Sequence, residues 1–201
     1  MHIDSKGLNP MTGVILAGGK NRRMGTNKAF LVVNGARIID RTVGIFKGIF
    51  EEVIIVTNDP LAYLDQNVTI VTDILPEKGA LGGLYTGLFF APHDRAFVCA
   101  CDMPFIDGKF IEYMIRKGSP YDIVSPDAGD GLQPMHAVYD KKCLPAIKSL
   151  LGQGKLKITD VYKSARTLTI RGDIIDTFDP EKKMFLNVNT YQDLQTIIKE
   201  V

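Results

Sequence analysis

The sequence has few cysteines, no long apolar run and almost no excess charge, and each of these absences excludes a class of protein. Its 201 residues include three cysteines, an odd number whose spacing does not indicate a disulfide framework. The most apolar stretch, 81–91, is broken by glycines and is far shorter than the ~20 residues of a membrane span. With 24 basic and 23 acidic residues, the net charge of +1 argues against broad, sequence-independent binding to nucleic acid.

The beginning of the chain also lacks targeting features. Residues 1–10 contain no apolar segment and no small-residue cleavage site, so we expect no signal peptide, a cytoplasmic location and a disordered N-terminal tail. No repeat, low-complexity tract or linker interrupts the rest of the chain. Residues 1–201 are therefore expected to form a single domain, and the 45% of hydrophobic residues are typical of an ordinary globular protein.

Short segments rich in Val and Ile alternate with stretches of helical spacing. The expected buried strands are 13–17, 53–57, 68–71, 96–101 and 122–125. The expected helices are 37–49, 81–91, 110–117, 141–150 and 191–200. This alternation predicts a three-layer, doubly wound α/β fold with a mainly parallel sheet. The segment 132–139 has no helix before it, so we expect it to enter the sheet as an antiparallel strand.

The loop after the first strand has the composition of a phosphate-binding loop. Three glycines, two arginines and two lysines lie within residues 18–28. Glycine lets the backbone approach a ligand and leaves N–H groups for phosphate oxygens, while Arg and Lys supply positive charge. The pattern is neither a P-loop nor a dinucleotide-binding G-x-G-x-x-G. It predicts a polyphosphate cradle, with a solvated basic turn as the alternative.

An acidic residue follows a second buried strand. Asp102 comes directly after 96–101 and is followed by Met103 and Pro104. A carboxylate at the end of a buried strand suits Mg²⁺, which takes one or two carboxylates together with phosphate oxygens. An ordinary turn or cap is the alternative for the motif alone. A phosphate cradle on the same sheet edge favours the Mg²⁺ interpretation.

Other strand ends carry polar or glycine-rich segments. Asn58 and Asp73 each follow a strand, where their side chains can reach a nucleobase or ribose, although a helix cap competes for Asn58. The segment 78–84, with Gly79 and Gly82, enters a helix. Such an entry lets a ligand lie against backbone N–H groups, and close helix packing is the other explanation.

Three further features have ordinary structural explanations beside functional ones. Cys99 and Cys101 are expected to be small buried thiols, with metal ligation as the lesser alternative. His136 lies in an apolar run and is expected to be a core histidine, or else a substrate contact. The segment 152–155 is either a connector or a lid over a second substrate.

Five sequence blocks, taken in order, carry a resemblance to a known family. They are Leu16-Ala17-Gly18-Gly19 with Arg23-Met24-Gly25 and Lys28, Gly79 with Leu81-Gly82-Gly83, Cys101-Asp102-Met103-Pro104, Gln133-Pro134-Met135-His136-Ala137-Val138-Tyr139, and Asn187-Val188-Asn189-Thr190. On these blocks the sequence resembles the molybdenum cofactor guanylyltransferases, the MobA family of the α/β nucleotidyltransferases, over about residues 11–200. The first block alone indicates only a nucleotidyltransferase. The double glycine at 18–19 and the late Asn-Val-Asn-Thr point to the guanylyl branch.

The resemblance implies a Rossmann-like nucleotidyltransferase fold and roles for particular residues. On the nucleotide side it implies contacts from Leu16, Ala17, Gly18, Gly19, Lys28, Asn58, Asp73, Gly79, Gly82 and Asp102. It implies that Arg23 and Lys28 hold phosphates and that Asp102 binds both GTP and Mg²⁺, so these three residues carry the catalysis. It also implies that the segment around Asn187 and Asn189 faces the pterin substrate.

The activity implied by the resemblance is transfer of GMP from GTP to Mo-molybdopterin, giving molybdopterin guanine dinucleotide and pyrophosphate. Alternatives are a related enzyme, such as a molybdopterin cytidylyltransferase or a sugar-phosphate nucleotidyltransferase, or a non-catalytic nucleotide-binding adaptor. Transient contact with cofactor-synthesis proteins or acceptor apo-enzymes is expected, but no contact with nucleic acid or membrane.

Overall fold

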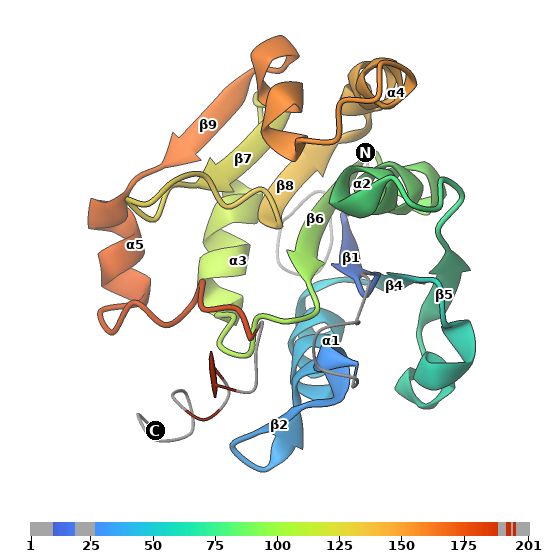
Figure 1. The fold of residues 1–201 in the computed structure, drawn as a ribbon. Coiled ribbons are helices and arrows are strands. Elements are labelled where there is room, and N and C mark those ends of the chain that lie inside the picture. Colours follow the sequence, from blue (N-terminus) through green and yellow to red (C-terminus); the bar gives the residue numbers. More distant parts are fainter. Residues whose placement is uncertain (1–9, 19–26, 189–191, 194, 196–201) are drawn as a thin grey trace.

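The computed structural model describes residues 10–18, 27–188, 192, 193 and 195, and its centre is a seven-stranded sheet (Figure 1). In spatial order the strands are β5 (Thr69–Thr72), β4 (Glu52–Thr57), β1 (Thr12–Leu16), β6 (Arg95–Ala100), β8 (His136–Asp140), β7 (Ile123–Pro126) and β9 (Thr167–Ile170). β8 is antiparallel to both neighbours, and the other pairs are parallel. The expected antiparallel strand is confirmed, although it begins at His136 rather than at 132.

Helices cover both faces of the sheet. They are α1 (Ile38–Ile49), α2 (Gly79–Phe90), α3 (Gly108–Arg116), α4 (Leu144–Gly152) and α5 (Gly172–Phe178). Side chains of α1, α3 and α5 share one buried cluster, and those of α2 and α4 share another on the opposite face. The predicted three-layer, doubly wound arrangement is therefore confirmed. No helix in the described part of the chain is long and apolar enough to cross a membrane.

Several elements differ from the predicted ones. A hairpin of β2 (Val32–Val33) and β3 (Ala36–Arg37), strand β9, helix α5 and the 3-10 helices η2 (Lys28–Phe30), η3 (Pro60–Gln66) and η5 (Ile158–Ser164) were not predicted. The helix expected at 141–150 divides into η4 (Lys141–Cys143) and α4, with a proline at the start of α4. The expected tail at 1–10 and helix at 191–200 lie almost entirely outside the described residues.

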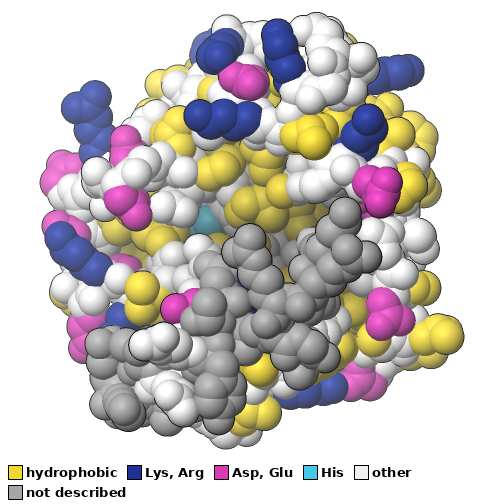
Figure 2. Space-filling view, viewed as in Figure 1, with side chains coloured by type: hydrophobic (Ala, Val, Ile, Leu, Met, Phe, Trp, Pro, Cys, Tyr) yellow, Lys and Arg dark blue, Asp and Glu magenta, His cyan; other side chains and the backbone are white. Residues whose placement is uncertain are grey.

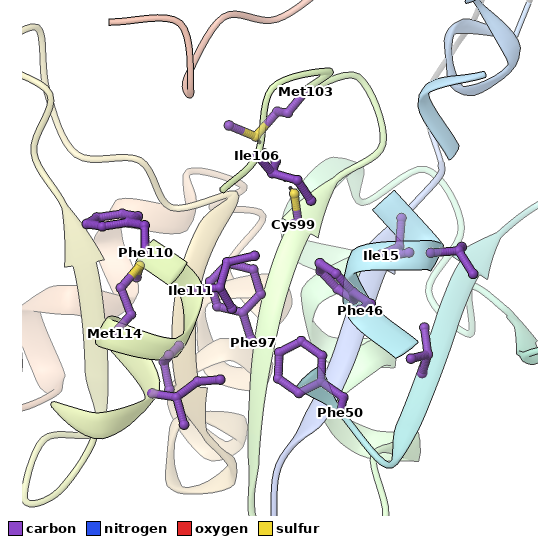
Figure 3. Packing of buried hydrophobic residues seen from close by; sticks show 14 of the residues in the cluster. Ile15, Phe46, Phe50, Phe97, Cys99, Met103, Ile106, Phe110, Ile111 and Met114 are labelled. Atoms are coloured by element: carbon purple, nitrogen blue, oxygen red, sulfur yellow. Dashed lines mark hydrogen bonds between the residues drawn. The ribbon is translucent and has the colours of Figure 1, made fainter. Parts of the chain in front are cut away.

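β1 is enclosed in the core, because side chains pack against it from both faces. All five of its residues are buried. On one face, the rings of Phe46, Phe50 and Phe97 contact one another below it (Figure 3). A Cβ atom at Gly13 would lie 2.6 Å from the rings of both Phe46 and Phe50, so only glycine fits there. A strand buried on both faces explains the continuous apolar run in the sequence.

Gly87 provides a test of this packing from the opposite face. In α2, a Cβ atom at position 87 would lie 2.5 Å from Cγ1 of Val14 on β1. We expect Gly87→Ala to lower the free energy of unfolding by about 1–3 kcal/mol, because overpacking outweighs the gain in helix propensity. Urea denaturation measures the effect. Gly44→Ala in α1 is the matched control, since nothing lies within 4 Å of its added Cβ, and it should be neutral or stabilising. Equal midpoints for the two variants would contradict this packing.

Candidate active site

Four parallel strands, β5, β4, β1 and β6, end at one edge of the sheet, so the loops that follow them lie together. From β1 the chain proceeds to β4 and β5 on one side and then returns to β6 on the other side (Figure 1). A change of direction of this kind opens a crevice at the carboxyl ends of the strands, and ligands of open α/β sheets bind there.

A pocket of about 320 Å³ lies at this edge, between β1, β4 and the start of α2. It is lined by Leu16, Gly18, Val56, Thr57, Asn58, Asp73, Pro76, Glu77, Gly79, Ala80, Gly83 and Met135. Five of the residues predicted to contact a nucleotide are among them: Leu16, Gly18, Asn58, Asp73 and Gly79. An apolar wall with a few polar groups at its rim suits a flat heteroaromatic ring that carries hydrogen-bonding groups.

Asp73 is held in place at the rim of the pocket by α2. Its Oδ1 accepts hydrogen bonds from the Thr86 hydroxyl at 2.7 Å and from the Leu75 backbone N–H at 3.0 Å. The Thr86 hydroxyl oxygen in turn accepts the N–H of Ile74 at 3.2 Å. A buried threonine thus fixes both the carboxylate and the backbone that follows it, so the rim is organised before a ligand arrives.

Two predicted contacts, Ala17 and Gly82, support the pocket without lining it. Ala17 is buried, and its N–H donates to the Val56 carbonyl at 2.8 Å. A Cβ atom at Gly82 would lie 2.8 Å from Cβ of Lys78 and 2.9 Å from the Leu75 carbonyl. Gly82 therefore permits close packing of α2 under the 75–78 loop. Close helix packing was the alternative that the sequence suggested for this segment.

Asp102 lies next to the end of β1 and faces Lys28. The Cys101 N–H donates to the Leu16 carbonyl at 3.2 Å, which brings the turn after β6 against β1. Nζ of Lys28 lies 3.7 Å from Oδ2 of Asp102, and each side chain is 21% exposed. Burial raises the pKa of Asp102, while the Lys28 ammonium acts in the opposite direction. A half-buried carboxylate beside a cation is a typical environment for a group that acts on phosphates.

Lys28 is positioned by its neighbours in η2. Asn27 caps this short helix by accepting the Ala29 N–H at 3.1 Å, and its amide donates to the Tyr63 hydroxyl at 2.8 Å. The ring of Phe30 packs on Tyr63 with centroids 5.0 Å apart. These contacts anchor both ends of η2, so the lysine ammonium is delivered to Asp102 from a fixed backbone.

The C-terminal segment reaches the same turn. The Val188 N–H donates to the Asp102 carbonyl at 2.9 Å, and the Val188 side chain is fully buried against Val33 and Ile38. Asn187, next to it, is exposed and its amide donates to the Phe185 carbonyl. The predicted pterin-facing segment therefore begins beside Asp102.

Three predicted site residues, Gly19, Arg23 and Asn189, lie outside the described residues. Their roles stay predictions from the sequence.

His136 and Cys99 are buried core residues, whereas Cys101 is partly buried. His136 is fully buried among the rings of Phe97, Phe110 and Phe185, and burial lowers its pKa to about 3. It is therefore neutral at physiological pH. Burial also raises the pKa of the Cys101 thiol to about 12, so the thiol is not a reactive nucleophile.

A divalent cation at Asp102 would take most of its ligands from elsewhere. No cluster of three His, Cys, Asp or Glu side chains suited to a metal occurs in residues 10–18 and 27–188. Mg²⁺ commonly binds through one or two carboxylates plus substrate phosphates and water, so a single carboxylate at a strand end fits it.

Several pocket residues were missed by the sequence-based prediction: Val56, Thr57, Pro76, Glu77, Ala80, Gly83 and Met135. Thr57 ends β4 and adjoins the predicted Asn58, while Gly83 lies in α2 within the predicted helix entry 78–84. Met135 is different, because it precedes β8 and the prediction considered only residues after strands. Since β8 is antiparallel to β6 and β7, its first residues lie at the edge of the sheet where those two strands end. Accordingly, the Ala100 N–H, at the end of β6, donates to the Met135 carbonyl.

Comparisons with known proteins agree with this geometry. The family model of the MobA-like NTP transferase domain matches residues 13–167. The chain is 38% identical over 190 residues to the molybdenum cofactor guanylyltransferase of Desulfosudis oleivorans, with 94% of each chain covered.

Two solved structures show that the fold is shared. The molybdopterin-guanine dinucleotide biosynthesis protein A of Archaeoglobus fulgidus has a TM-score of 0.82 at 22% identity, with 94% of this chain and 98% of that chain covered. Rv0371c of Mycobacterium tuberculosis, solved in complex with manganese, has a TM-score of 0.65 at 18% identity, with 96% and 100% covered.

Thr86 offers a test of how the pocket rim is organised. We expect Thr86→Val to weaken nucleotide binding about three- to tenfold, since Asp73 loses a donor and the Ile74 N–H loses its acceptor, at about 1 kcal/mol. Calorimetric titration with nucleotide measures it. Thr42→Val is a matched control, because Thr42 is also a buried helical threonine, bonded only to the Ile38 carbonyl in α1. A similar loss of affinity in both variants would contradict the role of Thr86.

Lys28 offers a test of the electrostatics. Lys28→Met removes the nearby cation that opposes the effect of burial, so the pKa of Asp102 should rise above its already raised value. The carboxylate then becomes protonated at a higher pH. When the solution is acidified, divalent-cation binding should therefore be lost at a higher pH than in the unmodified protein. The ¹³C shift of the Asp102 carboxyl carbon against pH reports the change. A midpoint that stays in place or moves to lower pH would show that Lys28 does not act on Asp102.

Proposed function

The chain belongs to the MobA-like NTP transferase family, and we propose that it transfers GMP from GTP to Mo-molybdopterin, giving molybdopterin guanine dinucleotide and pyrophosphate. The observation that carries the proposal is the placement of Asp102 and Lys28 beside the nucleotide-sized pocket, on one sheet edge. The 38% identity to a molybdenum cofactor guanylyltransferase supports the choice of nucleotide and acceptor.

In the proposed complex, the guanine and ribose occupy the pocket. Leu16 and Val56 supply the apolar wall, while Asn58 and Asp73 at the rim offer polar groups to the nucleoside. Gly18 and Gly79 let the backbone approach the ligand, and Gly79 has a positive φ of 61° that glycine adopts without strain. Ala17 and Gly82 hold these walls together from behind, and Gly19 is assigned to the nucleotide by sequence.

The triphosphate would extend from the pocket towards Asp102 and Lys28. The terminal phosphate of the pterin attacks the α-phosphorus of GTP in line, a new P–O bond forms, and the bond to pyrophosphate breaks. No covalent enzyme intermediate is required, so the protein contributes positioning and charge neutralisation. Lys28, with Arg23 assigned by sequence, offsets the negative charge that develops on the leaving pyrophosphate.

We assign Asp102 to a bound Mg²⁺. When bound, the cation would polarise the phosphoryl group and stabilise the leaving pyrophosphate. Asp102 suits this role because its carboxylate is partly exposed at the strand end and lies close to the proposed phosphate path. Lys28 favours the ionised form that a cation requires.

The acceptor is assigned to the segment that adjoins the Asp102 turn. The segment ending at Val188 is bonded to the Asp102 carbonyl and carries the exposed Asn187, with Asn189 assigned by sequence. In-line attack requires the terminal phosphate of the acceptor to enter opposite the leaving pyrophosphate, so this segment would hold the acceptor on that side of the α-phosphorus. A cytoplasmic location and transient contact with acceptor apo-enzymes remain part of the proposal.

The test is pyrophosphate release in a mixture of protein, Mg²⁺ and Mo-molybdopterin with GTP, CTP, UTP or ATP. We expect release with GTP at a kcat/KM at least about tenfold above that with the other nucleotides. A preference for CTP, or turnover only with a sugar phosphate, would replace the guanylyl assignment with one of the related transferases. Nucleotide binding without release would indicate a non-catalytic adaptor.

Asp102→Asn should lower kcat at least about 100-fold, because the variant keeps the shape of the side chain but loses the charge that binds the cation. The thermal midpoint should change little, since Asp102 lies at a strand end and not in the core. Asp94→Asn, an exposed aspartate before β6 at the far edge of the sheet, is the control and should retain activity. Near-normal turnover of Asp102→Asn would show that the metal assignment is wrong.

A further inference from the structure

The charges of this chain are strongly segregated along its sequence. The segment 141–166 holds seven basic residues and one acidic residue, while the whole chain has 24 basic and 23 acidic residues. The segment therefore carries a formal charge of +6, and the remainder carries −5. A local excess of this size attracts acidic groups even though the chain is nearly neutral overall.

The structure gathers this segment into one surface, formed by η4, α4, the turn after it, η5 and the two residues that follow, which we call the α4–η5 surface. α4 and η5 are in contact, and six of the seven basic side chains are exposed. These six are Lys142, Lys148, Lys155, Lys157, Lys163 and Arg166. Lys and Arg side chains gather in the upper part of Figure 2, where Figure 1 places α4 and the residues that follow it. The single acidic residue, Asp160, pairs with Lys163 at 2.6 Å.

The α4–η5 surface is too extended for one small anion. Lys142 precedes α4 and Lys155 follows it, and a helix of nine residues is about 13 Å long. Cations spread over this distance cannot converge on a single phosphate group. They match a partner that presents several carboxylates over a comparable area.

The α4–η5 surface also offers apolar contact. Leu156 is 44% exposed and lies between Lys155 and Lys157 in the sequence. A groove of about 410 Å³ beside it is lined by Ala146, Ser149, Leu150, Gln153, Lys155, Asp160, Lys163 and Ser164. An exposed leucine and a groove within a charged rim are features of protein interfaces. An extended nucleic acid would instead meet the −5 charge of the remaining chain beyond this surface.

We propose that the α4–η5 surface docks an acidic face of a partner protein, with an apolar side chain of that face packed on Leu156. α4 packs on α2, whose first residues line the pocket, so a docked protein would lie next to the sheet edge. The docking surface does not depend on which nucleotide the pocket takes.

Two fluorescent peptides and one oligonucleotide serve as probes of this surface. One peptide is decaglutamate, and the other is the same peptide with two central glutamates replaced by leucine. The oligonucleotide is a single-stranded DNA with the same charge as decaglutamate. Fluorescence anisotropy at low and at physiological salt gives their affinities. We expect the leucine-containing peptide to bind at least about threefold more tightly than decaglutamate, because it adds apolar contact, and Leu156→Ser to remove that difference.

Charge reversal supplies the matched comparison. The triple variant Lys155→Glu/Lys157→Glu/Lys163→Glu should bind the leucine-containing peptide at least about tenfold more weakly, because three attractive charge contacts become repulsive. The control is the triple variant Lys109→Glu/Lys117→Glu/Lys182→Glu, which changes the net charge equally at exposed sites outside this surface. Its affinity for the same peptide should fall less than about threefold. Both variants should keep their thermal midpoint and their pyrophosphate release, so a failure of the proposed function is seen separately.

Two outcomes would overturn the proposal. If the oligonucleotide bound more tightly than either peptide, the α4–η5 surface would be a general polyanion site. If both triple variants lost affinity for the peptide equally, the effect would come from net charge and not from this surface.

Discussion

The burial of β1 on both of its faces is the constraint on which the other parts of the site depend. Its flat, glycine-containing surface lets α2 and the phenylalanines of the opposite layer approach closely, with Gly13 and Gly87 at the two tightest contacts. The strand is thereby held between β4 and β6. Its end then places Leu16 and Gly18 where the pocket and the Asp102 turn adjoin. A shift of β1 would separate the nucleoside pocket from the carboxylate.

At this edge of the sheet, the negative charge of Asp102 lies beside the positive charge of Lys28. Asp102 is buried enough for its pKa to rise, and Lys28 lies close enough to oppose that rise. In the proposed mechanism, the carboxylate binds a cation and the lysine ammonium contacts a phosphate. Neither group is deeply buried, so a ligand can replace the contact between them without leaving an isolated charge in the core.

Much of the architecture could be predicted because its signals are local. Runs of Val and Ile flanked by glycine and acidic residues correctly predicted β1, β4, β5, β6 and β7, and helical spacing predicted α1 to α3. Elements whose stability comes from distant contacts were missed. β9 is a four-residue strand of alternating threonines that forms by pairing with β7. The β2–β3 hairpin was missed although its signal is local, because its turn is the pair Asn34 and Gly35, both with positive φ.

The sequence by itself determined which chemistry is present: a glycine-rich basic loop, acids at strand ends and family motifs around them. It also determined at which edge of the sheet the site lies, because the carboxyl ends of parallel strands lie at the same edge. Only the tertiary structure decided which of these residues meet. It separated Gly82, which packs behind the pocket, from Gly79, which lines it, and it added Met135, because an antiparallel strand begins where its neighbours end. Distances between residues far apart in the chain follow from helix and strand packing, which no local pattern contains.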